Sequence, residues 1–271
     1  MKIYIPTRGR IHNQVTLGQL KQAVGNKITL VTAADQHKAL KEANPGVDIE
    51  VLPKGVKGMP FIRQHILENS VDRYFCMIDD DLKFCTFDGV NDAGNRKMSA
   101  AEPKQLVKMF ETLENWLRSG VAHCGITPRF LNWNRTEPYI QSTRMLHLLA
   151  YDKLTVTAKG CRFDKNVKDY RFSMEDFHMT LQLLRAGHPN RVSLDYCSDP
   201  AASNTEGGVS EFRTLTTQEA NARFLAAQHP GFVKVKEKST KSWKGLAEEA
   251  PVRYDVAVQW QKAFKSSQQG K

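Results

Sequence analysis

Short apolar runs alternate with amphipathic stretches at the start of the chain. The apolar runs lie at residues 2–5, 28–32 and 74–78, and a more amphipathic segment lies at 48–53. Their lengths and residue types predict strands. The stretches between them carry apolar residues at helical spacing and end at Gly, Asn or Pro, which predicts helices. Alternating strands and helices favour right-handed crossover units. We therefore expect an α/β fold with a mostly parallel central sheet flanked by helices.

The pattern is less regular further along the chain. Residues 102–118 predict an amphipathic helix and residues 145–151 a buried strand. Residues 172–187 predict a second helix, which Ser173 would cap at its N-terminus. Residues 88–96 are polar and contain two glycines, so we expect a loop there.

Three successive aspartates, Asp79, Asp80 and Asp81, follow the fourth predicted strand directly. Ligands of open α/β sheets gather at the carboxyl ends of the strands. In an extended chain, Asp79 and Asp81 point to one side and Asp80 to the other. Two carboxylates on one side repel unless a cation lies between them, and a divalent cation shared with phosphate oxygens suits that place. A solvated acidic turn or a helix N-cap cluster explains the same triplet.

Arginines cluster near the same predicted sheet edge. The first strand leads into Pro6-Thr7-Arg8-Gly9-Arg10, where guanidinium forks and backbone amides suit a nucleotide base or phosphate. Asp35 ends the second strand at the same edge, and Arg63 lies on the helix after the third strand. An ordinary basic turn and a surface arginine on a helix are the alternatives.

The charge balance favours acidic partners. The chain has 39 Lys and Arg against 29 Asp and Glu, for a net charge of +10. The segment from Phe232 to Lys271 holds nine basic and four acidic residues, so half of the excess lies there. Such a balance makes a polyanion a plausible partner, although charge alone does not separate nucleic acid from other acidic partners.

The cysteine content and the length of the apolar runs limit which classes of protein fit this sequence. The five cysteines are scattered and form no Cys-x-x-Cys pair, so we expect reduced core thiols and no zinc site. No apolar run approaches the length of a membrane span, and the first residues predict a strand where a signal peptide would lie. These features predict a cytoplasmic protein.

Two segments mix basic and aromatic residues in the manner of nucleic-acid-binding surfaces. The first contains Arg129, Trp133 and Arg135, and the second contains Lys234, Lys236, Lys241 and Trp243. Arginine and lysine contact phosphates, and aromatic rings stack on bases. A half-buried strand and turn explains the first segment equally well, and a solvated helical tail with alternating charge explains the second.

A pair of acids opens the predicted helix at residues 172–187. Glu175 and Asp176 lie in its first turn, where carboxylates stabilise a helix through its dipole. Helix capping is therefore one explanation of the pair. Catalysis is the other, because a positioned carboxylate can take a proton from an attacking hydroxyl.

The order of these features resembles the GT-A fold of nucleotide-sugar-dependent glycosyltransferases. The resemblance rests on the first strand ending in Pro6-Thr7-Arg8-Gly9-Arg10, on Asp35 and Arg63, and on the Asp-x-Asp motif at residues 79–81. It implies that Mn²⁺ or Mg²⁺ is held by Asp81 and Asp79 against the diphosphate of the donor, for which a UDP-sugar is expected.

The resemblance also implies roles for the remaining candidates. Donor contacts would come from Pro6, Thr7, Arg8, Arg10, Asp35, Arg63, Asp79, Asp80 and Arg213. Asp176 would be the general base of an inverting enzyme, and Glu175 would orient the acceptor or hold Asp176 in place. His229 would complete the metal ligands, and the Gly-rich loop at residues 204–210 would cover the diphosphate.

Within this class the chain looks similar to the phage TET-associated glycosyltransferases, which attach sugars to hydroxymethylated pyrimidines in DNA. The shared features are the Ile5-Pro6-Thr7-Arg8-Gly9-Arg10 start, the aspartate triplet, the Glu-Asp helix and the compact length. A hexose or a pentose is the expected sugar, and the cytoplasm of the host cell is the expected location.

The resemblance divides the chain into parts. Residues 1–231 would form the catalytic domain, with a Rossmann-like nucleotide-sugar half at 1–87 and an acceptor half at 88–231, followed by a basic C-terminal extension at 232–271. Two other functions fit the sequence. One is a GT-A enzyme that acts on a protein, lipid or glycan, and the other is a non-catalytic nucleic-acid-binding protein.

Overall fold

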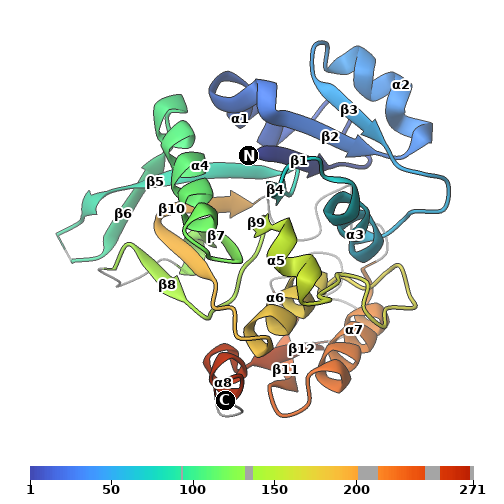
Figure 1. The fold of residues 1–271 in the computed structure, drawn as a ribbon, viewed down its shortest axis with the longest axis vertical. Helices are drawn as coiled ribbons and strands as arrows, with labels where there is room; N and C mark the ends of the chain where they lie inside the picture. Colours follow the sequence, from blue (N-terminus) through green and yellow to red (C-terminus); the bar gives the residue numbers. More distant parts are fainter. Residues whose placement is uncertain (93, 132–136, 201–212, 242–250, 269–271) are drawn as a thin grey trace.

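The computed structural model describes residues 1–92, 94–131, 137–200, 213–241 and 251–268. Its main feature is a ten-stranded sheet in the order β3-β2-β1-β4-β9-β7-β10-β5-β6, with β8 paired to β10 (Figure 1). The strands of this sheet are β1 (Lys2–Pro6), β2 (Ile28–Thr32), β3 (Asp48–Val51), β4 (Tyr74–Ile78), β5 (Leu82–Val90), β6 (Arg96–Ala100), β7 (His123–Pro128), β8 (Tyr139–Gln141), β9 (Leu148–Asp152) and β10 (Arg191–Pro200).

The first four strands are parallel, as the alternating pattern predicts. β1 lies between β2 and β4, and β2 pairs with β3. The crossovers between these strands are α1 (Val15–Val24), which runs into a short 3₁₀ turn, η1 (Gly25–Lys27), then α2 (Ala34–Ala43) and α3 (Met59–Asn69). Because parallel strands end at one edge of a sheet, β1, β2 and β4 bring their following loops together there.

Antiparallel pairs enter in the second half of the sheet. β9 runs antiparallel to both β4 and β7, whereas β10 is parallel to β7 and antiparallel to β5. β5 and β6 form a hairpin, so the expected loop at residues 88–96 is wrong at both of its ends. Residues 88–90 and Arg96 belong to strands near the sheet edge, where one face is open to solvent, and the described residues between them form the connection that was expected.

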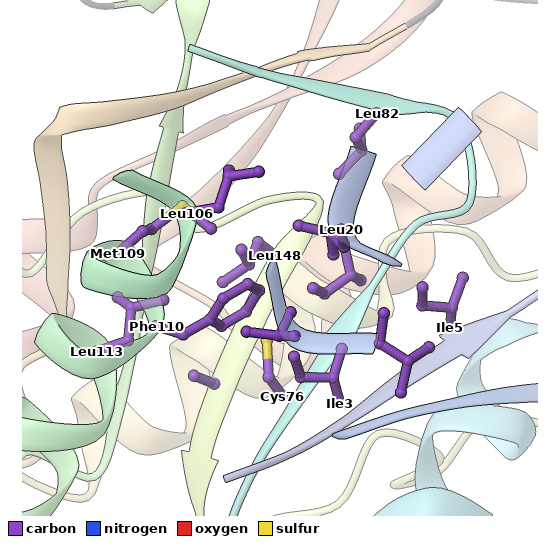
Figure 2. Packing of buried hydrophobic residues seen from close by; sticks show 14 of the residues in the cluster. Ile3, Ile5, Leu20, Cys76, Leu82, Leu106, Met109, Phe110, Leu113 and Leu148 are labelled. Carbon is purple, nitrogen blue, oxygen red and sulfur yellow. The ribbon is translucent and has the colours of Figure 1, made fainter. Parts of the chain in front are cut away.

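Helices cover both faces of the sheet. α1 and α4 (Pro103–Arg118) pack on one face with the inward residues of β1, β4 and β9 (Figure 2). α3, α5 (Lys153–Ala158) and α6 (Glu175–Arg185) contribute to the hydrophobic cluster on the other face. Apolar residues at helical spacing, such as Leu106, Phe110 and Leu113 of α4, form the buried stripe that the sequence predicts.

A smaller layer packs against the outer side of α6. It consists of α7 (Leu215–Gln228), the hairpin of β11 (Val233–Ser239) and β12 (Val252–Val258), and α8 (Trp260–Ser266). One hydrophobic cluster contains Leu181 and Leu184 of α6 together with Leu225, Val256 and Ala263. The boundary expected at residue 231 therefore falls inside a shared core.

The described residues bear on two expectations from composition. All five cysteines are buried with free thiols. None of the helices in the described part of the chain combines the length and the apolar composition that crossing a bilayer requires.

Candidate active site

The aspartate triplet forms a tight connection between β4 and β5. Thr16 of α1 holds this connection at three points. Its backbone N–H donates to the Asp80 carbonyl at 3.1 Å, its hydroxyl donates to the Asp79 carbonyl at 2.6 Å, and the same hydroxyl accepts from the Leu82 N–H at 2.8 Å. The carboxylates are thus positioned by a turn and its hydrogen bonds rather than by the alternation of an extended strand.

Asp80 is buried and bound to the first loop. Its Oδ2 accepts a hydrogen bond of 2.6 Å from the Thr7 hydroxyl, and its Oδ1 pairs with the Arg10 guanidinium. Thr7 and Pro6 are buried as well. Both carboxylate oxygens of Asp80 bind the chain in this structure, and its contact with the donor stays a prediction. Asp80 fixes the arginine-containing loop beside the acidic turn.

Asp79 and Asp81 are partly exposed and close enough to repel each other. Burial, and after it the charge of Asp79, raises the pKa of Asp81. Arg10 approaches Asp81 at 3.3 Å and offsets part of this repulsion. Carboxylate oxygens are suitable ligands for Mg²⁺ or Mn²⁺, but no group of three or more His, Cys, Asp or Glu side chains gathers for a metal within the described residues. A cation here fits if a diphosphate or water supplies the remaining ligands.

Arg63 links the acidic turn to the start of α6. Its Nη2 lies 2.8 Å from Oδ1 of Asp79, and its Nε lies 3.2 Å from Oε1 of Glu175. The residue is 4% exposed. Within the described residues its buried Nε and Nη1 have no hydrogen-bond partner, so the contact of Nε with Glu175 is an ion pair without a hydrogen bond. One guanidinium thus brings together two acidic motifs that lie far apart in the sequence, and it leaves a donor for a ligand.

Glu175 and Asp176 are unusually basic carboxyl groups. Burial raises the pKa of Glu175 to about 7, against the opposing charge of Arg63. Burial likewise raises the pKa of Asp176. The Asp176 Oδ1 accepts a hydrogen bond of 2.8 Å from the Phe177 N–H within the first turn of α6. A carboxylate whose pKa lies near neutrality is suited to accept a proton.

The expected cap of this helix is wrong. The N-cap position of α6 is Met174, and no side chain caps it. Ser173 instead accepts a hydrogen bond of 3.1 Å from the Asn221 amide of α7. The partner on α7 is distant in sequence, so the local Ser-x-x pattern could not reveal it.

Two further arginines approach the acid pair. Burial lowers the pKa of Arg213, while the charges of Glu175 and Asp176 act in the opposite direction. Arg144 shows the same combination of burial and a nearby Asp176. Arg213 therefore lies near the acid pair, and its contact with the donor stays a prediction. Arg144 was not among the sequence candidates.

Arg8 and Asp35 lie at the exposed end of the same sheet edge. Their side chains face each other at 3.4 Å, and each is more than half exposed. Both follow parallel strands, β1 and β2, which explains their proximity. An exposed pair of this kind contributes little to stability and stays available to a ligand.

His229 lies at the C-terminal end of α7 and contacts α6 through its ring. Its Nε2 lies 2.8 Å from Nδ1 of His178, and its Nδ1 lies 3.3 Å from Nη1 of Arg185. Both ring nitrogens thus have partners, and burial lowers its pKa to about 3. In this structure the ring nitrogens of His229 connect the end of α7 to α6, and metal ligation by His229 stays a prediction.

His147 is closer to the acids than its apolar surroundings suggest. Its φ angle is 63°, and the Leu148 N–H donates to the Leu146 carbonyl across it at 2.6 Å. The Nδ1 atom lies 3.1 Å from the Ser198 hydroxyl, as for a satisfied histidine. Its charge nevertheless acts on the pKa of Asp81, so it borders the acidic turn.

The nucleic-acid candidates have separate locations. Arg129 lies in η2 (Arg129–Leu131) after β7 and pairs with Asp199 at 3.0 Å. Lys234, Lys236 and Lys241 are exposed in or next to the β11–β12 hairpin. Trp133, Arg135, Trp243 and the loop at 204–210 lie outside the described residues.

Sequence reasoning missed three residues that shape the site. Thr16 and Arg144 carry no motif, since each is a single polar residue in an unremarkable stretch. Tyr151 of β9 is buried, and its pKa is raised by burial and opposed by Arg63. Only the pairing of β9 with β4 brings this tyrosine under the site.

The fold and the site define the class of GT-A glycosyltransferase folds. The defining features are the parallel strands β1 to β4, the acidic turn at residues 79–81 and the acid pair at the start of α6. Two solved structures share this fold. S. aureus TarS 1–349 in complex with UDP-GlcNAc matches with TM-score 0.52 and 12% identity, over 84% of this chain and 66% of that chain. Glucosyl-3-phosphoglycerate synthase from Mycobacterium tuberculosis, in complex with Mg²⁺ and UDP, matches with TM-score 0.50 and 10% identity, over 95% and 86%.

The sequence places the chain within this class. The family described as TET-associated glycosyltransferase matches residues 1–198. The chain therefore belongs to the TET-associated glycosyltransferase family. No curated protein matches it. The chain spans slightly less than two thirds of the TarS structure, and the low identities mean that the two structural matches show the fold alone.

Proposed function

We propose that the protein transfers a sugar from a nucleotide-sugar donor to a hydroxyl acceptor, with Asp176 as the general base of an inverting reaction. The observation that carries this proposal is the double contact of Arg63 with Asp79 and Glu175. Because of this contact, the donor-side acids and the acceptor-side acids face one shared site. If either acidic motif had only a structural role, there would be no reason for the two motifs to lie next to the same arginine.

The donor would lie at the carboxyl edge of β1, β2 and β4. Arg8 and Asp35 are exposed there for the nucleoside, and Arg10 and Arg63 supply fixed positive charge for the phosphates. Asp79 and Asp81 would hold Mn²⁺ or Mg²⁺ against a UDP-sugar. When bound, that cation would supply positive charge for the diphosphate leaving group.

The acceptor would approach from the side of α6. Asp176 takes the proton of the acceptor hydroxyl as that oxygen forms its bond to the anomeric carbon, and the bond from this carbon to the diphosphate breaks. Arg63 and Arg213 stabilise the negative charge that develops on the leaving group. Glu175 contacts Arg63 and so keeps the guanidinium in position.

Hydroxymethylated pyrimidine in phage DNA is the acceptor that we propose. The family to which the chain belongs carries the name TET-associated glycosyltransferase, and the net charge of +10 suits a polyanion. A base hydroxymethyl group has to leave the stack to reach Asp176, so a single strand or a flipped nucleotide is required.

Donor hydrolysis and transfer together test this function. Purified protein is incubated with a panel of UDP-sugars and Mn²⁺, with and without DNA that contains hydroxymethylcytosine, and nucleotide release and sugar incorporation are measured. Removal of a general base should lower transfer by about 10²–10⁴-fold. We expect that loss for Asp176→Asn and a comparable loss for Asp81→Asn, whereas the exposed Asp48→Asn should retain activity.

The outcomes separate the three functions that fit the sequence. Donor hydrolysis without transfer to hydroxymethylated DNA would move the acceptor to a protein, lipid or glycan. A non-catalytic DNA-binding protein would give a different pair of results. The parent protein would hydrolyse no donor, and the Asp81→Asn and Asp176→Asn variants would bind DNA as well as the parent does.

A further inference from the structure

The β11–β12 hairpin has two chemically different faces. Val233 and Val235 point into the cluster shared with α6 and α7. Residues that alternate with them point to the opposite face, and there β11 carries the exposed Lys234, Lys236 and Lys238. The hairpin is thus apolar toward the protein and basic on its outer face.

Strand pairing adds two residues of β12 to the outer face. Lys238 lies opposite Arg253, and Lys236 lies opposite Asp255. Directly opposed residues in an antiparallel pair project to the same face. Asp255 also forms an ion pair with Lys238, at 2.8 Å between Oδ2 and Nζ. Three exposed lysines, the largely buried Arg253 and one carboxylate therefore share this face.

The hairpin is held at a fixed position relative to the proposed base. Val256 belongs to the same buried cluster as Leu181 and Leu184 of α6. At the start of α6, the ring of Phe177 packs edge-on against Trp260 of α8, with 5.1 Å between ring centroids. Phe177 directly follows Asp176, so the C-terminal elements are packed against the catalytic end of the helix.

Arg144 lies between the basic face and Asp176. Its guanidinium lies 5.0 Å from the ring centroid of Phe177. Asp176 and Asp255 both act on its pKa, in opposition to burial. Asp255 belongs to the outer face of the hairpin, and Asp176 is the proposed base. Arg144 is close enough to both carboxylates to lie between the outer face and Asp176. We call Lys234, Lys236, Lys238, Arg253 and Arg144 the basic band.

We propose that the basic band binds the phosphates of a single nucleic-acid strand and leads its target nucleotide to Asp176. This inference rests on the proposed function, and it adds the route by which the acceptor enters. A single strand presents its bases without unpairing, which a hydroxymethyl group needs to reach Asp176, and the lysines of β11, spaced by about 7 Å, can contact the phosphates of such a strand. The family match ends at residue 198, so the hairpin lies outside the part that defines the family.

Matched double variants test the band. Lys234→Ala with Lys236→Ala removes two charges from the hairpin. Lys104→Ala with Lys108→Ala removes two exposed charges from α4, which is well separated from the hairpin (Figure 1). Binding of a fluorescein-labelled single-stranded DNA oligonucleotide is measured by anisotropy over a series of NaCl concentrations. UDP-sugar hydrolysis without DNA is measured in parallel.

The hairpin variant should bind more weakly, and the slope of log K against log salt should fall by roughly 1.4, because each lost phosphate contact on a single strand contributes about 0.7. The α4 variant should match the parent. UDP-sugar hydrolysis should be unchanged in both, since neither pair of lysines contacts the donor side.

Three results bear on the inference in different ways. Equal weakening by both variants, or by neither, would overturn it. Binding to phosphatidylglycerol vesicles that depends on Lys234 and Lys236, without oligonucleotide binding, would assign the band to lipid and overturn it too. If the parent hydrolyses no donor but the hairpin variant still shows the reduced slope, the band stands and the proposed function fails.

Discussion

The guanidinium of Arg63 contacts Asp79 on one side and Glu175 on the other. An ammonium group cannot reproduce this planar double contact, so Arg63→Lys should lower activity by at least about tenfold. Arg63→Met leaves the buried Glu175 carboxylate without its partner, and the free energy of unfolding should fall by about 3–5 kcal/mol. Urea denaturation and initial-rate measurements would check both effects.

Arg118 provides the control for this pair of variants. It contacts Glu114 at 2.6 Å on the exposed surface of α4. Exposed pairs of this type contribute roughly 0–1 kcal/mol, so Arg118→Met should leave stability and activity almost unchanged. Equal losses at Arg63 and Arg118 would contradict the bridging role of Arg63.

The acid pair predicts a pH dependence. Burial raises the pKa of Glu175 to about 7 and also raises that of Asp176. Because the base acts in its ionised form, kcat/KM should rise with pH through the raised pKa of Asp176 and then level off. A profile whose acidic inflection lies in the ordinary carboxyl range, at about pH 4 or below, would exclude a base with a raised pKa.

Residue types alone could predict part of this site. The Asp79 and Asp81 carboxylates follow an apolar strand, and Glu175 and Asp176 open a helix, so both motifs are visible in sequence. Their partners are not visible in this way. Arg144 and Thr16 have no local pattern, and the burial of Asp80 depends on Thr7 and Arg10, more than 60 residues away in the chain.

At the level of elements, α3 depends on a close approach at its start. Gly58 has φ of 82°, and a Cβ atom there would lie 2.0 Å from the carbonyl oxygen of Tyr170. Gly58→Ala should therefore lower the free energy of unfolding by at least about 2 kcal/mol, through backbone strain and overpacking. Since α3 carries Arg63, activity should fall as well. Thermal unfolding and rate measurements would test this.

Gly18 of α1 is the matched control. It lies inside a helix, and a Cβ atom there would meet nothing within 4 Å. Gly18→Ala should raise the free energy of unfolding by roughly 0.5–1 kcal/mol, because alanine favours the helix. Destabilisation by both substitutions would contradict the assignment of strain to Gly58.

Element boundaries were predictable where periodicity was strong. The alternation through residue 78 gave the parallel half of the sheet, and α4 follows its apolar stripe. The β5–β6 hairpin was missed because it lies at the edge of the sheet. Edge strands carry polar residues, so the hairpin lacks the apolar alternation of a strand that faces the core. The capping of α6 was missed because Ser173 finds its partner on another helix.

The molecule as a whole joins its C-terminal layer to the catalytic helix through one hydrophobic cluster. Leu225 of α7 is fully buried in it, and Leu225→Ala should cost about 2–5 kcal/mol. Because the cluster includes α6, far-UV circular dichroism and tryptophan fluorescence should report one coincident unfolding transition. An earlier separate transition of the C-terminal layer would contradict this coupling.

Leu154 offers the corresponding control on the surface. It is 58% exposed on α5, so Leu154→Ala should change the free energy of unfolding by less than about 0.5 kcal/mol. The comparison separates loss of core packing from loss of a leucine side chain in general.

The sequence by itself determined the features that depend on neighbouring residues. Strand and helix periods are set by local backbone geometry, and the acidic turn, the acid pair and the net charge can be seen without coordinates. Tertiary structure alone decided which charges meet. Arg63, Arg144 and Arg213 come from three separate segments, and the basic face of the hairpin is directed by the burial of its valines against α6. These placements arise from packing between distant segments, which no short-range pattern encodes.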